Sequence, residues 1–129
     1  MTVVRKNCVS AIFIRNSQFL IEKRLQSDVD PGYAIPGGHV EPGETLEAAL
    51  RREILEELDV SIEDPKLVFI GYHTASDAEQ QRIHYFLITR WNETPNSRGA
   101  ELISWTSDPK MLSLEADRNA LENVQSTLV

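Results

Sequence analysis

Residues 45–58 carry the pattern that most constrains the fold of this chain. An aliphatic residue recurs at every fourth position, at Leu46, Leu50, Ile54 and Leu58. This spacing gathers the four side chains on one face of an α-helix. Thr45 stands just before them and can accept a hydrogen bond from the first turn as an N-cap. The pattern therefore predicts an amphipathic helix that must bury one face against another layer of the protein.

The segments around this helix alternate between strand patterns and turns. Apolar and β-branched stretches predict strands over 7–14, 18–24, 33–35, 66–73, 83–91 and 102–106. A second apolar stripe predicts a closing helix over 116–128. Strands, helix, strands and helix within 129 residues indicate a single domain spanning 1–129. The expected architecture is an α/β (α+β) sandwich, not a regular series of βαβ units.

The charge balance argues against several classes of partner. The formal net charge is -7, whereas proteins that bind duplex nucleic acid are usually basic because they contact phosphates. No stretch reaches the roughly 18 apolar residues of a membrane span, and no signal peptide is apparent. A single cysteine, Cys8, rules out a disulfide framework within the chain. We therefore expect a cytoplasmic protein that binds neither duplex nucleic acid nor membranes.

Three glutamates on the predicted helix share one narrow arc. Glu53, Glu56 and Glu57 are spaced i, i+3 and i+4, so their charges repel one another. Glu57 also falls inside the apolar stripe, where a carboxylate needs a partner. Mg²⁺ prefers oxygen ligands, can be shared with substrate phosphates, and would relieve both problems. Arg52 can pair with Glu56 at i+4, and Glu44 can act as a capping group or face the metal. A solvated acidic surface is the alternative interpretation.

A glycine-containing loop leads into this helix. Gly37, Gly38 and Gly43 are expected to adopt positive φ angles and to let the backbone approach a metal or a phosphate closely. The segment thus combines a loop whose backbone can approach a metal or a phosphate closely with an acidic helix face.

From Gly38 to Val60 the residues match a known pattern. Gly38, then Glu44, then Arg52 to Val60 resemble the Nudix box, G-x5-E-x7-R-E-U-x-E-E-x-G-U, in which U is aliphatic. Every charged position of the box is present. Asp59 stands where the box has its second glycine, and Asp tolerates the left-handed backbone region better than most residues.

This resemblance implies a fold, an activity and a cofactor. Nudix proteins are αβα sandwiches with a mixed central sheet and an acidic catalytic helix. They hydrolyse a phosphoanhydride bond in a nucleoside diphosphate derivative, usually with Mg²⁺ or Mn²⁺. The resemblance implies a metal site at Glu53, Glu56, Glu57 and Gly38. It further implies that Arg52 orients the site and that Glu44 is an auxiliary group. One of the three helix glutamates, or a Glu in a later loop, would deprotonate the attacking water. Glu101 is the candidate for that last role.

The ends of the chain look most like MutT-type nucleoside triphosphate pyrophosphohydrolases, which release a monophosphate and pyrophosphate. In that comparison Arg24 lies near a phosphate, and the backbone of Gly37 and Gly38 approaches the substrate. Asp117, or Asn119 as second choice, matches a residue that reads the purine edge with paired hydrogen bonds. The alternative for Asp117 is that it caps the closing helix.

Three strand aromatics, Tyr72, Tyr85 and Phe86, are candidates for stacking on the base, although core packing is the commoner role of such residues. ADP-ribose, other nucleotide sugars and dinucleoside polyphosphates remain alternative substrates. The non-enzyme alternatives are a nucleotide-binding module without catalysis and a purely structural acidic domain. The expected partner is a small nucleotide. Many relatives form homodimers, and the sequence leaves the oligomeric state open.

Overall fold

The computed structural model describes residues 5–23, 32–74, 79–92, 94–96 and 102–127. Two α-helices, α1 (Leu46–Leu58) and α2 (Glu115–Thr127), accompany the strands, and a short 3₁₀ helix spans Pro109–Met111. The strands are β1 (Arg5–Arg15), β2 (Gln18–Lys23), β3 (Tyr33–Ala34), β4 (Gly37–His39), β5 (Ile62–Glu63), β6 (Lys66–Thr74), β7 (Gln80–Ile88), β8 (Arg90–Trp91) and β9 (Leu102–Thr106). No helix among the described residues is long and apolar enough to cross a membrane.

A mixed sheet forms the middle layer. In the described part of the chain, its strand order is β3-β2-β1-β7-β6, with β4 paired to β1 and β9 paired to β2. β1 runs parallel to β7 and antiparallel to β2 and β4. The hairpin between β1 and β2 turns at Asn16 and Ser17, whose φ angles of 54° and 62° suit a tight turn that follows the twist of the strands. The expected mixed α/β sandwich is therefore confirmed.

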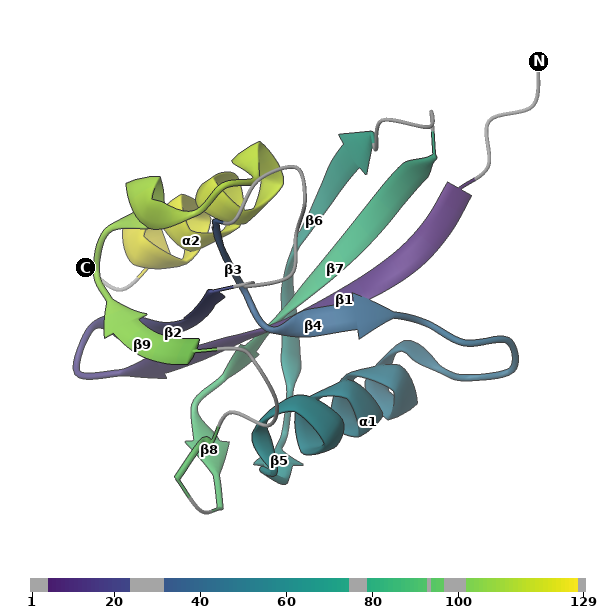
Figure 1. Cartoon of the computed structure of the whole chain (residues 1–129), viewed down its shortest axis with the longest axis horizontal. Helices are drawn as coiled ribbons and strands as arrows, with labels where there is room; N and C mark the ends of the chain where they lie inside the picture. The colour runs from purple at the N-terminus through teal and green to yellow at the C-terminus, as the bar shows by residue number, and fades with distance from the viewer. Residues whose placement is uncertain (1–4, 24–31, 75–78, 93, 97–101, 128–129) are drawn as a thin grey trace.

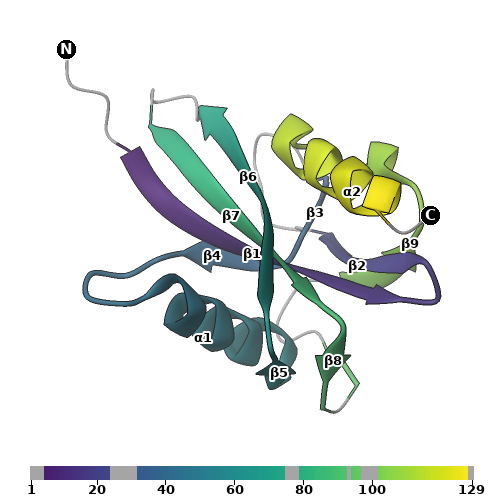
Figure 2. The ribbon, with the colours of Figure 1, turned by 180° about the vertical axis from the view of Figure 1, so that it is seen from behind.

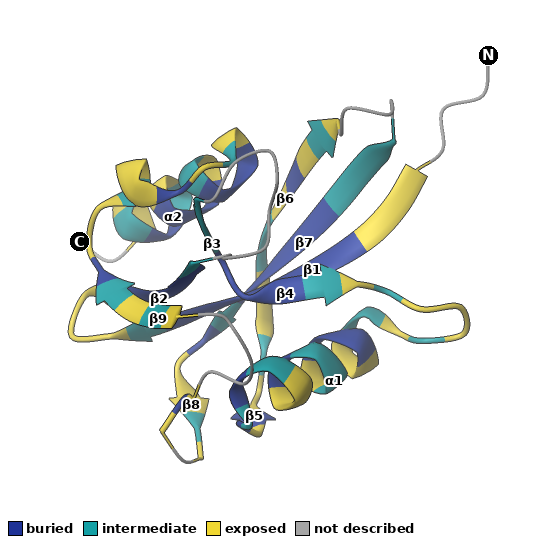
Figure 3. Cartoon of the chain, viewed as in Figure 1, coloured by how far each residue is buried: buried dark blue, intermediate teal, exposed yellow. Residues whose placement is uncertain are grey.

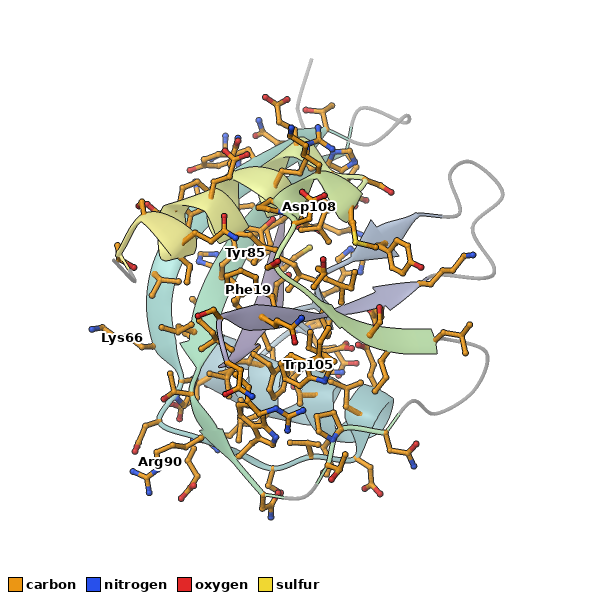
Figure 4. All side chains as sticks on the ribbon, turned by 90° about the vertical axis from the view of Figure 1, so that its left-hand side faces the viewer. Phe19, Lys66, Tyr85, Arg90, Trp105 and Asp108 are labelled. Atoms are coloured by element: carbon orange, nitrogen blue, oxygen red, sulfur yellow. The ribbon has the colours of Figure 1, made fainter. Side chains whose placement is uncertain are left out.

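The two helices cover opposite faces of this sheet (Figures 1 and 2). Side chains of a strand point alternately to its two faces, and β1 follows this rule. Ile12 packs in the cluster beneath α2, whereas Val9 and Phe13 pack in the cluster beneath α1. The central strands are buried along much of their length, as Figure 3 shows. Figure 4 shows Phe19 and Tyr85 between α2 and the sheet, and Lys66 and Arg90 pointing away from it.

Local sequence signals account for both ends of α1. The Thr45 hydroxyl accepts a hydrogen bond from the Ala48 amide at 3.1 Å, so the predicted N-cap is confirmed. Asp59 adopts φ 59° and ψ 40°, and its amide donates to the Leu55 carbonyl at 3.1 Å. The Asp at the box's second glycine position thus adopts the left-handed conformation that ends a helix.

Two expectations about the backbone were wrong. Gly37 and Gly38 belong to strand β4, and among the described glycines only Gly43 has a positive φ, of 85°. Gly37 is needed for close approach instead, because a Cβ there would collide with the Val9 carbonyl oxygen of the neighbouring strand. The predicted strand 83–91 is interrupted at Thr89, and β8 turns away to pair with β5.

Candidate active site

The backbone of strand β4 lies directly beneath α1. A Cβ on Gly38 would collide with the carboxylate of Glu53, so the strand and the Glu53 side chain lie in contact. A larger residue at this position would displace Glu53 or separate α1 from the sheet. The box glycine at position 38 is therefore explained by close packing against the Glu53 side chain and not by an unusual backbone angle.

Arg52 connects the loop before α1 to the glutamates on the helix. Its Nε and Nη2 donate to the two oxygens of Glu44 at 2.7 and 2.8 Å, a bidentate pair. Nη2 also donates to the His39 carbonyl at 3.1 Å. Nη1 donates to Glu53 Oε1 at 2.9 Å and, more weakly, to Glu56 Oε2 at 3.4 Å. The predicted Arg52–Glu56 pair is present, but Glu44 is the principal partner of Arg52.

Glu44 is bound by a side chain and by the backbone, and the N-cap of the helix is Thr45 and not Glu44. In addition to its bonds with Arg52, it accepts a hydrogen bond from the Glu41 amide at 2.9 Å. The bond from Arg52, followed by the one from Glu41, lowers the pKa of Glu44 from 4.5 to about 2. The same pairing raises the pKa of Arg52. Glu44 therefore stays ionised over the physiological range and holds the Arg52 guanidinium in place.

The three helix glutamates differ in their surroundings. The side chain of Glu53 is 16% exposed and that of Glu56 is 61% exposed. Glu57 is half-buried, and its Oε2 atom is shielded from solvent. Glu53 and Glu57 line a pocket of about 610 Å³, whereas Glu56 does not. The pocket therefore brings together two of the three glutamates predicted from the helical spacing.

The pocket runs from these glutamates across β4 to the first turn of α2. Gly37 and Gly38 form part of its wall between the two ends. Asp117 and Ile35 lie at the far end. Its volume is in the range that a small organic ligand occupies. Glu53, Glu57 and Asp117, which were predicted to bind a metal or to read a base, thus line one cavity.

Asp117 accepts hydrogen bonds from Tyr85 and from the backbone of Ile35. It is only 3% exposed, and it lies inside α2, not at the capping position before it. Its Oδ1 accepts a hydrogen bond from the Tyr85 hydroxyl at 2.5 Å, and its Oδ2 accepts one from the Ile35 amide at 3.3 Å. Burial, and then the neighbouring Asp117, raise the pKa of Tyr85. The hydroxyl therefore remains a hydrogen-bond donor at neutral pH.

The other predicted ligand-contacting residues lie elsewhere. Asn119 is exposed on α2 and does not line the pocket. Phe86 packs beneath α1, and the exposed Tyr72 ring lies 5.7 Å from the Arg82 guanidinium. Tyr85 is fully buried, so it cannot stack on a base. Arg24 and Glu101 lie outside the described residues.

The link between Tyr85 and Asp117 is the feature that the sequence analysis missed. Strand alternation puts Ile83, Tyr85 and Leu87 on one face of β7. It does not reveal that this face meets the first turn of α2, because the two segments are about 30 residues apart. Only the packing of α2 on the sheet brings them together.

The acidic end of the pocket fits a divalent cation in its donor chemistry. No three His, Cys, Asp or Glu side chains in the described ranges converge into a ready-made metal cage. Mg²⁺, however, is often held by only one or two carboxylates and completes its shell with water and substrate phosphates. Glu53 and Glu57 supply hard oxygen donors on the pocket wall. Of the four residues predicted to form the metal site, Glu53, Glu57 and Gly38 line the pocket.

Comparisons with known proteins agree with these observations. The model of the NUDIX domain matches residues 4–125. An 8-oxo-dGTP diphosphatase of Proteus vulgaris is 31% identical over 66% of this chain and 76% of its own length. The nucleoside triphosphatase NudI of an Enterobacter species is 43% identical, but the match covers only 46% of this chain and 45% of the relative.

Two solved structures extend the likeness to the whole fold. The MutT NUDIX hydrolase of Burkholderia pseudomallei aligns with a TM-score of 0.83 and 26% identity, covering 93% of this chain and 98% of that protein. The E. coli ORF135 protein also aligns with a TM-score of 0.83, at 25% identity, covering 98% of this chain and 93% of that protein. Nudix enzymes generally use divalent metal ions. Since the family model spans nearly the whole chain and Gly38, Glu53 and Glu57 of the box line its pocket, this protein belongs to the Nudix family, as a hydrolase that acts on acid anhydrides.

Proposed function

We propose that this enzyme hydrolyses a nucleoside triphosphate to a nucleoside monophosphate and pyrophosphate in a Mg²⁺-dependent reaction. One observation carries the proposal: a single pocket of about 610 Å³ connects the carboxylates of Glu53 and Glu57 to the buried carboxylate of Asp117. Glu53 and Glu57 are suited to a cation that also binds the phosphates. Asp117 is suited to hydrogen bonding with the polar edge of a base.

At the acidic end, Glu53 and Glu57 would hold the divalent ion, with Glu56 at the exposed margin. The bound ion would neutralise phosphate charge and lower the pKa of water. One of the pocket glutamates takes the proton from the attacking water. Arg52 orients Glu53 through its 2.9 Å bond, and Glu44 in turn orients Arg52. Such fixed positions favour in-line attack on phosphorus, in which positioning and electrostatics supply most of the rate enhancement.

At the other end, Asp117 accepts hydrogen bonds from N–H groups on the edge of a purine. Relatives named 8-oxo-dGTP diphosphatase and nucleoside triphosphatase support this class of substrate. Asn119 is less well placed than Asp117, because it is exposed outside the pocket. Arg24 remains our candidate for a phosphate contact, and Glu101 for an additional base or metal ligand.

The proposal is tested by incubating the enzyme with the common deoxynucleoside triphosphates, 8-oxo-dGTP, ADP-ribose and a dinucleoside polyphosphate. Each reaction is run with Mg²⁺, with Mn²⁺ and with excess chelator, and the products are identified by mass. We expect a monophosphate and pyrophosphate from at least one triphosphate, and loss of this activity with chelator. Cleavage of ADP-ribose or of the dinucleoside polyphosphate alone would overturn the proposed substrate class. Turnover that withstands chelation would overturn the role of the metal.

A further inference from the structure

Tyr85 occupies an unusual position for a residue with a polar group. It is fully buried on β7, in the cluster beneath α2, and Figure 4 shows it between that helix and the sheet. It does not line the pocket, but the residue that it bonds to, Asp117, does. A hydroxyl in a protein core is costly unless it is hydrogen-bonded, and Phe would fill the same space without that cost. The hydroxyl therefore calls for an explanation beyond packing.

The Tyr85 hydroxyl donates a hydrogen bond to the Asp117 carboxylate at the α2 end of the pocket. Its 2.5 Å bond holds Oδ1 of Asp117, while the Ile35 amide holds Oδ2 at 3.3 Å. Because one bond comes from β7 and the other from the segment after β3, the plane of the carboxylate is fixed by two separate elements. A carboxylate has roughly four acceptor positions, more than these two bonds occupy.

An ionised carboxylate can only accept hydrogen bonds. Its two oxygens are complementary to two neighbouring N–H groups on a ligand, as in the bidentate pairs that carboxylates form with guanidinium groups. Guanine presents such a pair, because its N1–H stands beside its exocyclic 2-amino group. Hypoxanthine lacks the 2-amino group, and adenine places an acceptor beside its amino group.

On this basis, and resting on the proposed triphosphate hydrolysis, we propose that Tyr85 is a positioning residue for base recognition. It holds Asp117 as an oriented double acceptor, and the pocket therefore favours a base whose edge presents two adjacent N–H groups. Tyr85 touches neither the substrate nor the reacting atoms and acts through Asp117 alone.

The test compares dGTP with dITP, which differ at this edge only by the 2-amino group. In the wild-type enzyme we expect kcat/KM for dGTP to exceed that for dITP by about tenfold or more, since a site built to bind a polar group discriminates against a substrate lacking it. In Tyr85→Phe we expect KM for dGTP to rise about fivefold, with kcat within twofold of wild type, because only binding of the base is affected. The ratio of kcat/KM for dGTP to kcat/KM for dITP should therefore fall.

Two further variants separate positioning from packing. Tyr72→Phe removes the hydroxyl of an exposed tyrosine, 55% accessible, and should leave KM and the dGTP preference unchanged. Asp117→Asn replaces one acceptor with a donor and should abolish the preference. Adding Tyr85→Phe to Asp117→Asn should then have little further effect on KM, because the hydroxyl acts only through the carboxylate.

The outcomes distinguish this inference from the proposed function. If no triphosphate is hydrolysed, the proposed function fails, and calorimetric binding of dGMP and dIMP tests the inference alone. Equal affinities for the two monophosphates, or equal kcat/KM values for dGTP and dITP in the wild-type enzyme, would overturn it, whether or not Tyr85→Phe folds. A Tyr85→Phe enzyme with a lower Tm but an unchanged KM and preference would show that the hydroxyl serves only stability, and would equally overturn it.

Discussion

The two ends of the pocket are built in opposite ways. At the α1 end, Glu44, Arg52 and Glu53 come from one short stretch of chain, and the side chain of Arg52 is 23% exposed. At the α2 end, Ile35, Tyr85 and Asp117 come from three distant segments, and Asp117 is only 3% exposed. The first end is a charged network that is partly open to solvent, and the second is a buried carboxylate that accepts hydrogen bonds from Tyr85 and Ile35.

This difference suits the two tasks proposed for the pocket. Phosphates and a cation arrive with water and must release it, so side chains at that end need access to solvent. Recognition of a base edge gains from acceptors whose orientation is set before the ligand arrives. Changes at the α1 end should therefore lower kcat, and changes at the α2 end should raise KM. The predictions below test this division, beginning with the largest effect.

Glu57→Gln should have the largest effect, because it removes a charge from the wall of the pocket at the end proposed to bind the phosphates. We expect kcat to fall by about 10²–10⁴-fold at saturating Mg²⁺, the range for loss of a catalytic proton acceptor or ligand. Thermal unfolding should be unchanged or shifted upward, because repulsion on α1 is relieved. The control is Glu47→Gln, which alters an exposed glutamate on the same helix. Normal turnover of Glu57→Gln would remove this residue from the site.

Arg52→Lys should have an intermediate effect. Lysine keeps the charge but cannot form the fork that bonds both oxygens of Glu44 and also reaches Glu53. We expect kcat to fall about tenfold through misplacement of Glu53, with KM little changed. The steady-state kinetics of Arg52→Lys are compared with those of a control variant, Arg90→Lys, which changes an exposed arginine on β8. A rise in KM without a loss of kcat would contradict the division between the two ends.

Glu44→Gln should produce a pH-dependent change in stability. The folded-state pKa of Glu44 lies at about 2, below its ordinary 4.5, so the ionised form favours the folded state. That contribution is fully present above pH 4.5 and is lost as the pH falls toward about 2. The difference in unfolding free energy between wild type and Glu44→Gln should therefore shrink over this range. Urea denaturation of both proteins at neutral and acidic pH checks this, and a difference that stays constant with pH would refute it.

Asp59→Gly should have the smallest effect and lies outside both ends of the pocket. A non-glycine residue in the left-handed region is strained, and glycine relieves that strain. We expect the free energy of unfolding to rise by about 0.5–1 kcal/mol, with kcat and KM unchanged. Chemical denaturation with parallel kinetics measures both quantities. A loss of activity would mean that the C-terminal end of α1 takes part in the site after all.

These two ends also differ in how far the sequence predicted them. Capping by Thr45, the apolar stripe of α1 and the cluster around Arg52 depend on residues less than 20 positions apart, and helical periodicity relates them directly. The conformations of Gly37 and Gly38 were wrongly predicted, because the need for glycine there comes from Val9 and Glu53 in neighbouring elements.

By itself the sequence determined the acidic helix, its caps, the mixed α/β sandwich and the family, because all of these follow from local spacing and from the box. It also singled out Asp117, but not what holds it. Only the tertiary structure brought Tyr85 and Ile35 to the two oxygens of that carboxylate. Strand alternation records which side chains share a face, whereas the partner of that face depends on how α2 packs across the sheet.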